Sequence, residues 1–421
     1  MGNSFGLTIY LLKNVRLSYL RFMNLESTQT NTDKRTNSTT NERESTRIRE
    51  NLLRNFHNRV HSWLRNSLFF RSRLRYISLM KPSIYNLTRD DLIAVCEELG
   101  QPAYRAKQVW PWLYVQFVSD WAQMRNIPKT LLLALEERFS LPSVKALQIE
   151  GPEGATRKIL VGLDDNECVE EVLLPSGDRN TVCVSSQVGC KFGCAFCASG
   201  KAGYLRDLSA GEIVGQVILA SQTFGRRPEN VVFMGMGEPF DNYDEALKAV
   251  RILNDQDGLC IGARKITLST SGVIPGIQRL SNEGIQVELS VSLHAPEDAL
   301  RSRLMPVNNK YPLADLMAAC QAYTEKTRRI ITFEYTLIKG LNDTQHHAEQ
   351  LIRLLRNLSC RVNLIPLSPV EEFDGDTPPR AAAERFIQVL DKHHINATLR
   401  DSKGSTVKAA CGQLRRKLVP R

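Results

Sequence analysis

The chain has 421 residues, of which 42% are hydrophobic and 24% are charged, as in ordinary globular proteins. This length allows two or three domains, and no apolar run approaches the ~20 residues that a membrane-spanning helix needs, so we expect a soluble protein without a membrane partner. The formal net charge of +10 comes from residues 1–82, which hold 15 Lys and Arg against 5 Asp and Glu. The remainder is neutral, so charge alone does not indicate nucleic-acid binding by the folded body.

Residues 1–82 differ in composition from everything that follows. They are rich in Thr, Asn and Arg and lack apolar periodicity, which predicts a disordered basic leader or extension. Residues 51–82 contain Arg but no acid, as organelle transit segments do, whereas residues 26–50 carry five acids. We favour a non-catalytic extension, or a start codon placed too early, and hence a cytoplasmic protein. If residues 1–79 are a transit peptide, the location would be an organelle stroma or matrix.

Residues 83–142 have a helical pattern. Thr88 and Asp91 have the spacing of a capping box at the start of the first helix. The stretch "YRAKQVWPWLY" interleaves aromatic and basic residues, which can bind nucleic acid by stacking and phosphate contact. Trp110, Trp112 and Leu113 also suit the core of a small helical domain. We therefore predict a helical accessory domain here, with RNA binding as its hypothetical role.

Residues 143–182 change to a period of two. The stretches "KALQIE", "RKILVGL", "CVEEVLLP" and "NTVCVSS" are typical of short strands, and "GPEG" and "PSGD" are typical of turns between them. This segment is predicted to be a short β extension.

Strand and helix patterns alternate over residues 183–401. Strands are expected at "NVVFMG", "KITLST", "VELSVSLH", "ITFEYTL", "RVNLIPL" and "ATLR", and Ser209 with Glu212 predicts another capped helix. This is the pattern of an α/β protein with about six parallel βα units. A complete eight-fold barrel usually needs ~250 residues, so we expect a partial (β/α)6 barrel. In such folds the chemistry lies at the carboxyl ends of the strands.

Ten cysteines are scattered along the chain, except for three in "GCKFGCAFC" at Cys190, Cys194 and Cys197. The scatter indicates a reducing compartment rather than a disulfide framework. Structural zinc sites normally close with four ligands, and no fourth ligand lies nearby. Three thiolates suit a [4Fe–4S] cluster with one iron left open, which we favour over zinc. The other isolated cysteines, apart from two discussed below, are assigned to packing: Cys96, Cys168, Cys260, Cys320 and Cys360.

The cysteine triplet, with Phe196 before its last cysteine, resembles the signature of radical S-adenosylmethionine (SAM) enzymes, and "GMGEP" resembles their Gly-Gly-Glu element. A wider set of stretches resembles the RlmN/Cfr family of radical SAM RNA methyltransferases: "CVSSQVGCKFGCAFCASG", "VFMGMGEP", "LSTSG", "VSLHAP", "MPVN", "FEYTLIKGLND", "VNLIPL" and "ACGQL". The resemblance covers residues 83 to 417 and leaves out the leader. It implies a partial (β/α)6 radical SAM barrel with a C-terminal segment, residues 402–421, that carries Cys411.

The resemblance also implies roles for single residues. Cys190, Cys194 and Cys197 match the ligands of the cluster. The positions that hold SAM match Gly237, Glu238, Ser269, Ser292, Leu293, His294 and Asn363. Cys411 matches the cysteine that is methylated first, and Cys183 the cysteine that later forms a disulfide with it. Glu170 matches the proton acceptor, although Glu171 lies beside it in the sequence.

The implied reaction is methylation of C2 of an adenosine in 23S rRNA, and also in tRNA at the adenosine 3′ of the anticodon. Two SAM molecules would be used per turnover, one to methylate Cys411 and one to generate a radical, with an external one-electron donor. The substrate would be partly assembled or unfolded RNA, because a buried base must be unstacked, and the enzyme would act as a monomer. Two alternatives stay open: C8 methylation of rRNA, as in the Cfr branch, and a non-catalytic zinc or RNA-binding protein.

Overall fold

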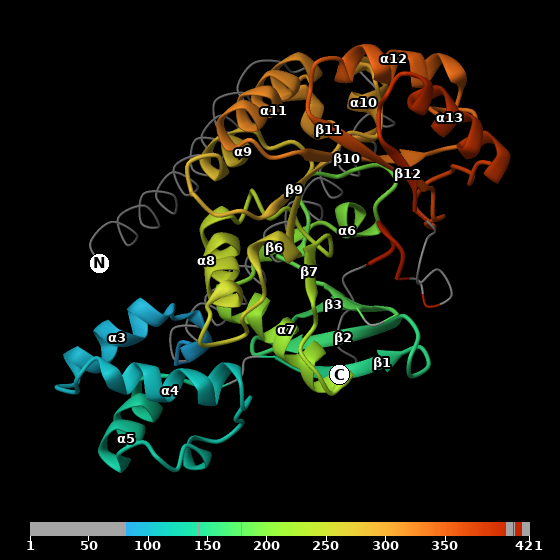
Figure 1. Ribbon diagram of the computed structural model, residues 1–421. Coiled ribbons are helices and arrows are strands. Elements are labelled where there is room, and N and C mark those ends of the chain that lie inside the picture. The colour runs from blue at the N-terminus through green and yellow to red at the C-terminus, as the bar shows by residue number, and fades with distance from the viewer. Residues whose placement is uncertain (1–80, 142–143, 178, 401–406, 408, 415–421) are drawn as a thin grey trace, which may run out of the picture. The chain divides into compact units, whose positions relative to one another are not determined.

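The computed structural model describes residues 81–141, 144–177, 179–400, 407 and 409–414 (Figure 1). The predicted leader and most of the segment 402–421 lie outside the described residues. None of the described helices has the length and apolar character needed to cross a bilayer.

The first part of the described chain is helical, as the sequence predicts (Figure 1). Thr88 and Asp91 form the expected capping box: the Thr88 hydroxyl accepts from the Asp91 amide at 3.1 Å, and the Asp91 carboxylate accepts from the Thr88 amide at 2.9 Å. The elements are η1 (Ile84–Asn86), α3 (Arg89–Glu98), α4 (Tyr104–Tyr114), η2 (Trp121–Gln123) and α5 (Lys129–Arg138).

Buried aromatic and aliphatic side chains hold this helical part together and dock it on the following domain. Trp110 and Leu113 are fully buried, while Trp112 is half-buried. The Trp110 indole also donates to the Asp255 carboxylate at 3.1 Å, beyond the end of α8 (Tyr243–Asn254). Because the indole N–H would be costly to bury unpaired, this bond fixes the helical part against α8.

One ten-stranded sheet forms the centre of the remaining described residues. Its strand order is β1-β2-β3-β4-β7-β8-β9-β10-β11-β12. The first four strands pair antiparallel, and every pair from β4 to β12 is parallel. The strands are β1 (Val144–Glu150), β2 (Arg157–Leu163), β3 (Cys168–Ser176), β4 (Arg179–Cys183), β7 (Asn230–Phe233), β8 (Ile266–Thr270), β9 (Glu288–Ser292), β10 (Ile331–Leu337), β11 (Cys360–Pro366) and β12 (Ala397–Leu399).

Helices connect each parallel strand to the next (Figure 1). They are α6 (Ala198–Lys201), α7 (Ala210–Phe224), α8, α9 (Ile274–Leu280), α10 (Asp298–Leu304), α11 (Leu313–Thr327), α12 (Gln345–Leu355) and α13 (Arg380–Lys392), with short turns η3 (Ala263–Lys265) and η4 (Pro306–Asn309). β1 and β12 remain the edges of the sheet, so the barrel is open. The predicted α/β fold, a partial barrel of six βα units preceded by a β extension, is confirmed. β12 is the strand expected at "ATLR", and the seventh parallel strand is β4, which was predicted as part of the β extension.

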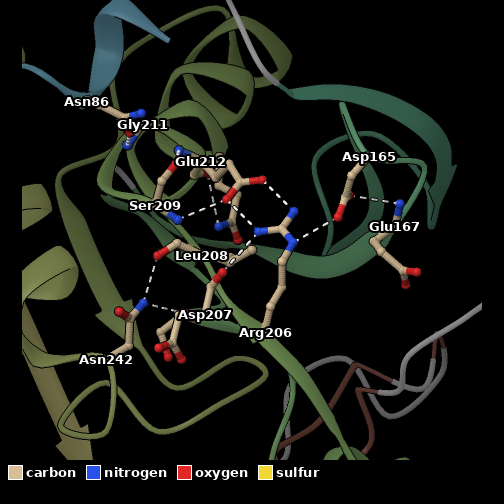
Figure 2. A network of polar contacts seen from close by, with 12 residues as sticks. Asn86, Asp165, Glu167, Arg206, Asp207, Leu208, Ser209, Gly211, Glu212 and Asn242 are labelled. Carbon is tan, nitrogen blue, oxygen red and sulfur yellow. Dashed lines mark hydrogen bonds and ion pairs between the residues drawn. The ribbon is translucent and has the colours of Figure 1, made fainter. Parts of the chain in front are cut away.

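A second, two-stranded sheet was not predicted: β5 (Gln187–Gly189) pairs with β6 (Tyr204–Asp207), and the cysteine triplet lies between them. Figure 2 shows how this hairpin is fixed. Arg206 on β6 donates to the Glu212 carboxylate at 2.7 and 2.9 Å and to the Asp165 carboxylate at 2.9 Å. Glu212 also completes the predicted capping box with Ser209. The cysteine loop is thus tied to α7 and to the β2–β3 turn.

Candidate active site

A pocket opens at the carboxyl ends of the parallel strands, where the sequence places the chemistry. Its walls combine sulfur, carboxylate, hydroxyl and apolar groups. The lining residues are Cys190, Phe192, Cys194, Phe196, Cys197, Phe233, Met234, Gly235, Gly237, Glu238, Ser269, Thr270, Ser271, Ser292, His294, Met305, Glu334, Thr336, Ile365, Pro366, Leu367, Ser368, Cys411 and Gly412. This mixture suits a ligand that has charged, polar and apolar parts.

All three cysteines of the triplet line this pocket. Cys190 directly follows β5, and its amide donates to the Gly203 carbonyl at 3.3 Å. The Cys197 amide donates to the Cys194 carbonyl at 3.2 Å, which folds the loop into a turn before α6. The hairpin and the helix thus present three sulfur atoms from one short loop.

The donor set fits a cluster of several metal ions better than a single ion. Burial raises the pKa of the Cys190 thiol to about 12 and that of Cys194 well above its usual range, and the neighbouring cysteines raise both further. Three sulfurs that repel one another as thiolates need a cationic partner. Yet no three His, Cys, Asp or Glu side chains of the described residues are grouped so that they could hold one metal ion. Three thiolates are the ligand set of a [4Fe–4S] cluster with one iron left open.

Gly237 and Glu238 follow β7 and form a second wall of the pocket. Gly237 has φ +100°, and a Cβ there would lie 2.6 Å from the Gln187 Cβ, so only glycine fits. The buried Glu238 carboxylate accepts from the Phe240 amide at 3.0 Å and from the Ser271 amide at 2.6 Å. Burial raises the pKa of Glu238, and these two hydrogen bonds oppose that shift. The carboxylate is therefore fixed in place as a polar group of the wall.

Ser269, Ser292 and His294 line the pocket from the ends of β8 and β9. Burial, with the nearby Arg301 charge, lowers the pKa of His294 to about 3, so its ring is neutral at physiological pH. Its Nδ1 accepts from the Thr336 amide at 2.9 Å, which leaves the ring proton on Nε2. The ring also meets Phe196 edge-on at 4.8 Å between centroids. The neutral His294 ring thus offers an Nε2–H hydrogen-bond donor and no positive charge.

Leu293 and Asn363 are not among the lining residues. The Leu293 side chain is fully buried in the core. The Asn363 amide donates to the Glu334 carboxylate at 2.9 Å. Glu334 itself lines the pocket, and sequence reasoning did not single it out. Its only signal is a lone charge inside the apolar strand "ITFEYTL".

Arg301, on α10, was also not identified from the sequence as a residue of the site. It is fully buried and donates to the carbonyls of Ser271, Ser292 and Leu293 at 2.8, 3.1 and 3.2 Å, and to the Asn308 side chain at 2.8 Å. Burial lowers its pKa to about 10, so it still carries a charge at physiological pH. One guanidinium thus binds the loops after β8 and β9 together, next to the SAM positions implied by the sequence.

Cys411 lines the same pocket, although it is far from the triplet in sequence. Its segment is fastened to α6: the Ala198 amide donates to the Gly412 carbonyl at 2.8 Å, and the Ser199 hydroxyl to the Leu414 carbonyl at 2.6 Å. Cys411 keeps exposed surface in the pocket, while the protein around its sulfur desolvates it and raises the pKa of the thiol.

Cys183, at the end of β4, is buried and is not a lining residue. Cys411 is nevertheless close enough for its charge to change the pKa of the Cys183 thiol. Burial and then the Cys411 charge raise the pKa of the Cys183 thiol to about 12. Both cysteines are free thiols in this structure. The two cysteines that the resemblance pairs therefore lie within electrostatic reach of each other.

Glu170 and Glu171 face opposite sides of the sheet. Val172 pairs directly with Cys183, and residues two apart on a strand share a face, so Glu170 lies on the face that carries Cys183. Both carboxylates are fully buried. Glu170 pairs with Lys158 at 3.3 Å. Neither oxygen of Glu171 has a hydrogen-bond partner among the described residues, and burial raises its pKa well above the usual range.

Comparison with known proteins agrees with the fold. Residues 184–355 match the radical SAM superfamily, and residues 83–141 match the ribosomal RNA large subunit methyltransferase N-terminal domain. A crystal structure of a radical SAM methyltransferase from Sphaerobacter thermophilus superposes with a TM-score of 0.76 at 46% identity, over 79% of this chain and 99% of that chain. The fold is that of a radical SAM methyltransferase.

Curated relatives narrow the assignment. A Geobacillus kaustophilus protein named "Probable dual-specificity RNA methyltransferase RlmN" is 46% identical over 339 residues, which cover 80% of this chain and 93% of that protein. A Streptococcus agalactiae protein of the same name is 45% identical over 350 residues, covering 81% and 95%. The chain belongs to the RlmN family of radical SAM RNA methyltransferases. It is therefore a methyl-transferring enzyme whose cofactors are a [4Fe–4S] cluster and SAM.

Proposed function

We propose that this enzyme methylates C2 of an adenosine in 23S rRNA, and also in tRNA 3′ of the anticodon, through an S-methylated Cys411. The observation that supports it most directly is the position of Cys411 in one pocket with the three cysteines of the triplet. A thiol acceptor beside the place where a radical is generated is what this two-stage reaction requires.

In this proposal Cys190, Cys194 and Cys197 hold the cluster. Gly237, Glu238, Ser269, Ser292 and His294 line the pocket where SAM would bind. Leu293 and Asn363 belong to the same proposed SAM set, although they are not among the lining residues. When bound, the two cofactors supply an electron, a methyl group and a 5′-deoxyadenosyl radical. An external one-electron donor would keep the cluster reduced. The alternative of a non-catalytic zinc protein is not favoured, because the chain belongs to a family of radical SAM RNA methyltransferases.

The side chains of this chain supply nucleophiles and a base. An adenine C2 carbon is a poor nucleophile, whereas a thiolate is a good one, so Cys411 is the first methyl acceptor. Burial raises the pKa of its thiol, while the Arg400 charge lowers it. Once the Cys411 methyl carbon is joined to the base, Glu170 accepts the ring proton. The Cys183 thiol would then lose its proton and attack the Cys411 sulfur: an S–S bond forms, the C–S bond breaks, and the carbon takes a proton to become the product methyl. The one electron left over from the radical addition would return to the cofactor site that supplied it.

RNA contact is proposed for the helical domain and the pocket mouth. Tyr104 is 50% exposed on α4, and the Arg105 guanidinium lies 4.8 Å from the centre of its ring. Such a pair can stack on an unpaired base and contact a phosphate. The target base must leave its stack to reach the pocket, so unassembled or locally unfolded RNA is the proposed substrate. We propose that the enzyme acts in the cytoplasm as a monomer.

The test uses the full chain, reconstituted with iron and sulfide under anaerobic conditions. Incubation with SAM, a reductant and either a 23S rRNA fragment or a tRNA transcript should give 2-methyladenosine, identified by mass spectrometry against both methyladenosine standards. Finding 8-methyladenosine would support the C8 alternative, and finding neither would reject the methylation proposal. A product from the rRNA fragment but not from the tRNA transcript would reject the proposal that tRNA is also a substrate.

The thiol roles have a separate test. Cys183→Ala should accumulate a covalent protein–RNA adduct, because the step that breaks the C–S bond is lost. Cys411→Ala should form neither adduct nor product. Cys360→Ala is the matched control, since Cys360 on β11 is a half-buried thiol outside the pocket, and it should behave as the unmodified enzyme. If Cys183→Ala gives product and no adduct, the release step assigned to Cys183 is wrong.

A further inference from the structure

A chain of three charged side chains runs from Glu170 to the protein surface. Lys158 Nζ lies 3.3 Å from Glu170 Oε1 and 3.1 Å from Glu150 Oε2. The exposed fraction of the side chains rises along this chain from 0% for Glu170, through 6% for Lys158, to 30% for Glu150. One buried lysine therefore connects a fully buried carboxylate with a carboxylate that water reaches.

The register of the β extension produces this alignment. Glu150 on β1 pairs directly with Lys158 on β2. Lys158 pairs with Val172 on β3, which makes Glu170 its diagonal neighbour on the same face. That face also carries Cys183, because Val172 pairs with Cys183 on β4. Three adjacent strands thus supply one side chain each, and the row begins on the face of the sheet that carries Cys183.

Stability alone gives a poor reason for this arrangement. Burying a lysine and a carboxylate costs several kcal/mol per ion, and their attraction often no more than offsets that cost. An apolar pair of similar size would serve the core as well. The Glu170 side chain, however, is not exposed to solvent, so it cannot release a proton directly to water. A buried base that takes one proton in each reaction must lose it before the next.

We propose that Lys158 and Glu150 are positioning residues that orient Glu170 and carry its proton to water. The proposal rests on the role of Glu170 as proton acceptor in the proposed function. Protonated Glu170 gives its proton to Lys158 while the Lys158 ammonium gives one of its own to Glu150. Glu170 is again a carboxylate, Lys158 is again an ammonium, and Glu150 releases the proton to solvent. No electron or further reactant is needed.

The proposal is tested at the proton-removal step with RNA that carries deuterium at adenine C2. In Cys183→Ala the trapped adduct should have lost the deuterium, since the base has already acted. Lys158→Met should accumulate an adduct that keeps the deuterium and should lower turnover by about tenfold, within the range for general-base effects. Lys158→Arg, which keeps the charge, should recover most of the turnover. The control is Lys145→Met, because Lys145 is exposed on β1.

Glu150→Gln provides a second test, since Glu150 is partly exposed and its replacement should not impair folding. It should complete its first turnover at nearly the normal rate and slow the later ones by about tenfold, whereas Glu153→Gln, in the neighbouring exposed turn, should change neither. If Glu170→Gln traps the deuterated adduct but neither Lys158→Met nor Glu150→Gln has any effect, the relay is refuted. If Glu170→Gln removes the deuterium normally, the proposed base is wrong instead.

Discussion

The two adjacent glutamates of β3 should respond oppositely to the same substitution. Glu170 lies on the face of the sheet that carries Cys183. Glu171 lies on the other face, is fully buried and has no hydrogen-bond partner among the described residues, although its charge also raises the pKa of Cys183. Burial raises the pKa of Glu171 well above its ordinary value of 4.5. We therefore expect Glu171→Gln to retain methylation and to stabilise the protein increasingly as the pH rises, and Glu170→Gln to lose methylation.

The magnitude follows from proton linkage. Above pH 4.5 the unfolded chain releases the Glu171 proton, while burial makes the folded protein release it only at a higher pH. The folded state then binds more protons than the unfolded state, so stability falls as the pH rises, by about 1.4 kcal/mol per pH unit. Glutamine cannot ionise and does not show this loss. Between pH 6 and pH 8 the advantage of Glu171→Gln should grow, by at most about 2.7 kcal/mol, which is the linkage limit for one proton over two pH units.

The assay is urea unfolding of the anaerobic holoenzyme, followed by tryptophan fluorescence at pH 6, 7 and 8. Burying the glutamine amide adds an offset that is the same at every pH, so the slope with pH is the decisive quantity. Glu153→Gln, at an exposed position, is the control for loss of a carboxylate and should show no slope. A constant difference between Glu171→Gln and the unmodified protein across the three pH values would refute the reasoning.

Three further substitutions test the pocket. Cys194→Ser should lose most bound iron and the visible absorption of the cluster, because a serine oxygen is a poorer ligand for iron than a thiolate; iron analysis after reconstitution checks this. Gly237→Ala should weaken SAM binding at least about tenfold in equilibrium titration, because its Cβ would meet Gln187 at 2.6 Å in a backbone conformation with φ +100°. Arg301→Met should destabilise the protein by about 3 kcal/mol in thermal unfolding, because the carbonyls it binds lose their donor.

Most of the fold could be predicted because its strands and helices are long enough to show their periods, and because Thr88 and Ser209 mark helix starts by local chemistry. The β5–β6 pair could not, since strands of three and four residues are too short to show a period of two. Arg301 stayed hidden for another reason. Its sequence neighbourhood, "DALRSRL", is typical of an exposed helix, and only the tertiary fold brings backbone carbonyls around it.

The choice between Glu170 and Glu171 shows the same limit within the site. Strand alternation predicts that the two face opposite sides, but it does not say which side faces the pocket. That depends on pairing with β4, a long-range property of the sheet. Motif resemblance could select Glu170 by position, and the register now supplies a physical reason for the selection, because Lys158 and Cys183 share its face.

The polar residues of the pocket wall also determine the register in which β10 pairs with its neighbours. Glu334 pairs with Ser292 on one side and Asn363 on the other, so these polar groups line up on the inner face. The preceding residue, Phe333, pairs with apolar residues on both neighbouring strands and faces the helices. A slip by one residue would place Phe333 in the pocket and the Glu334 carboxylate under apolar helices, at a cost of several kcal/mol. The residues that make the pocket polar therefore also exclude the alternative pairings of β10.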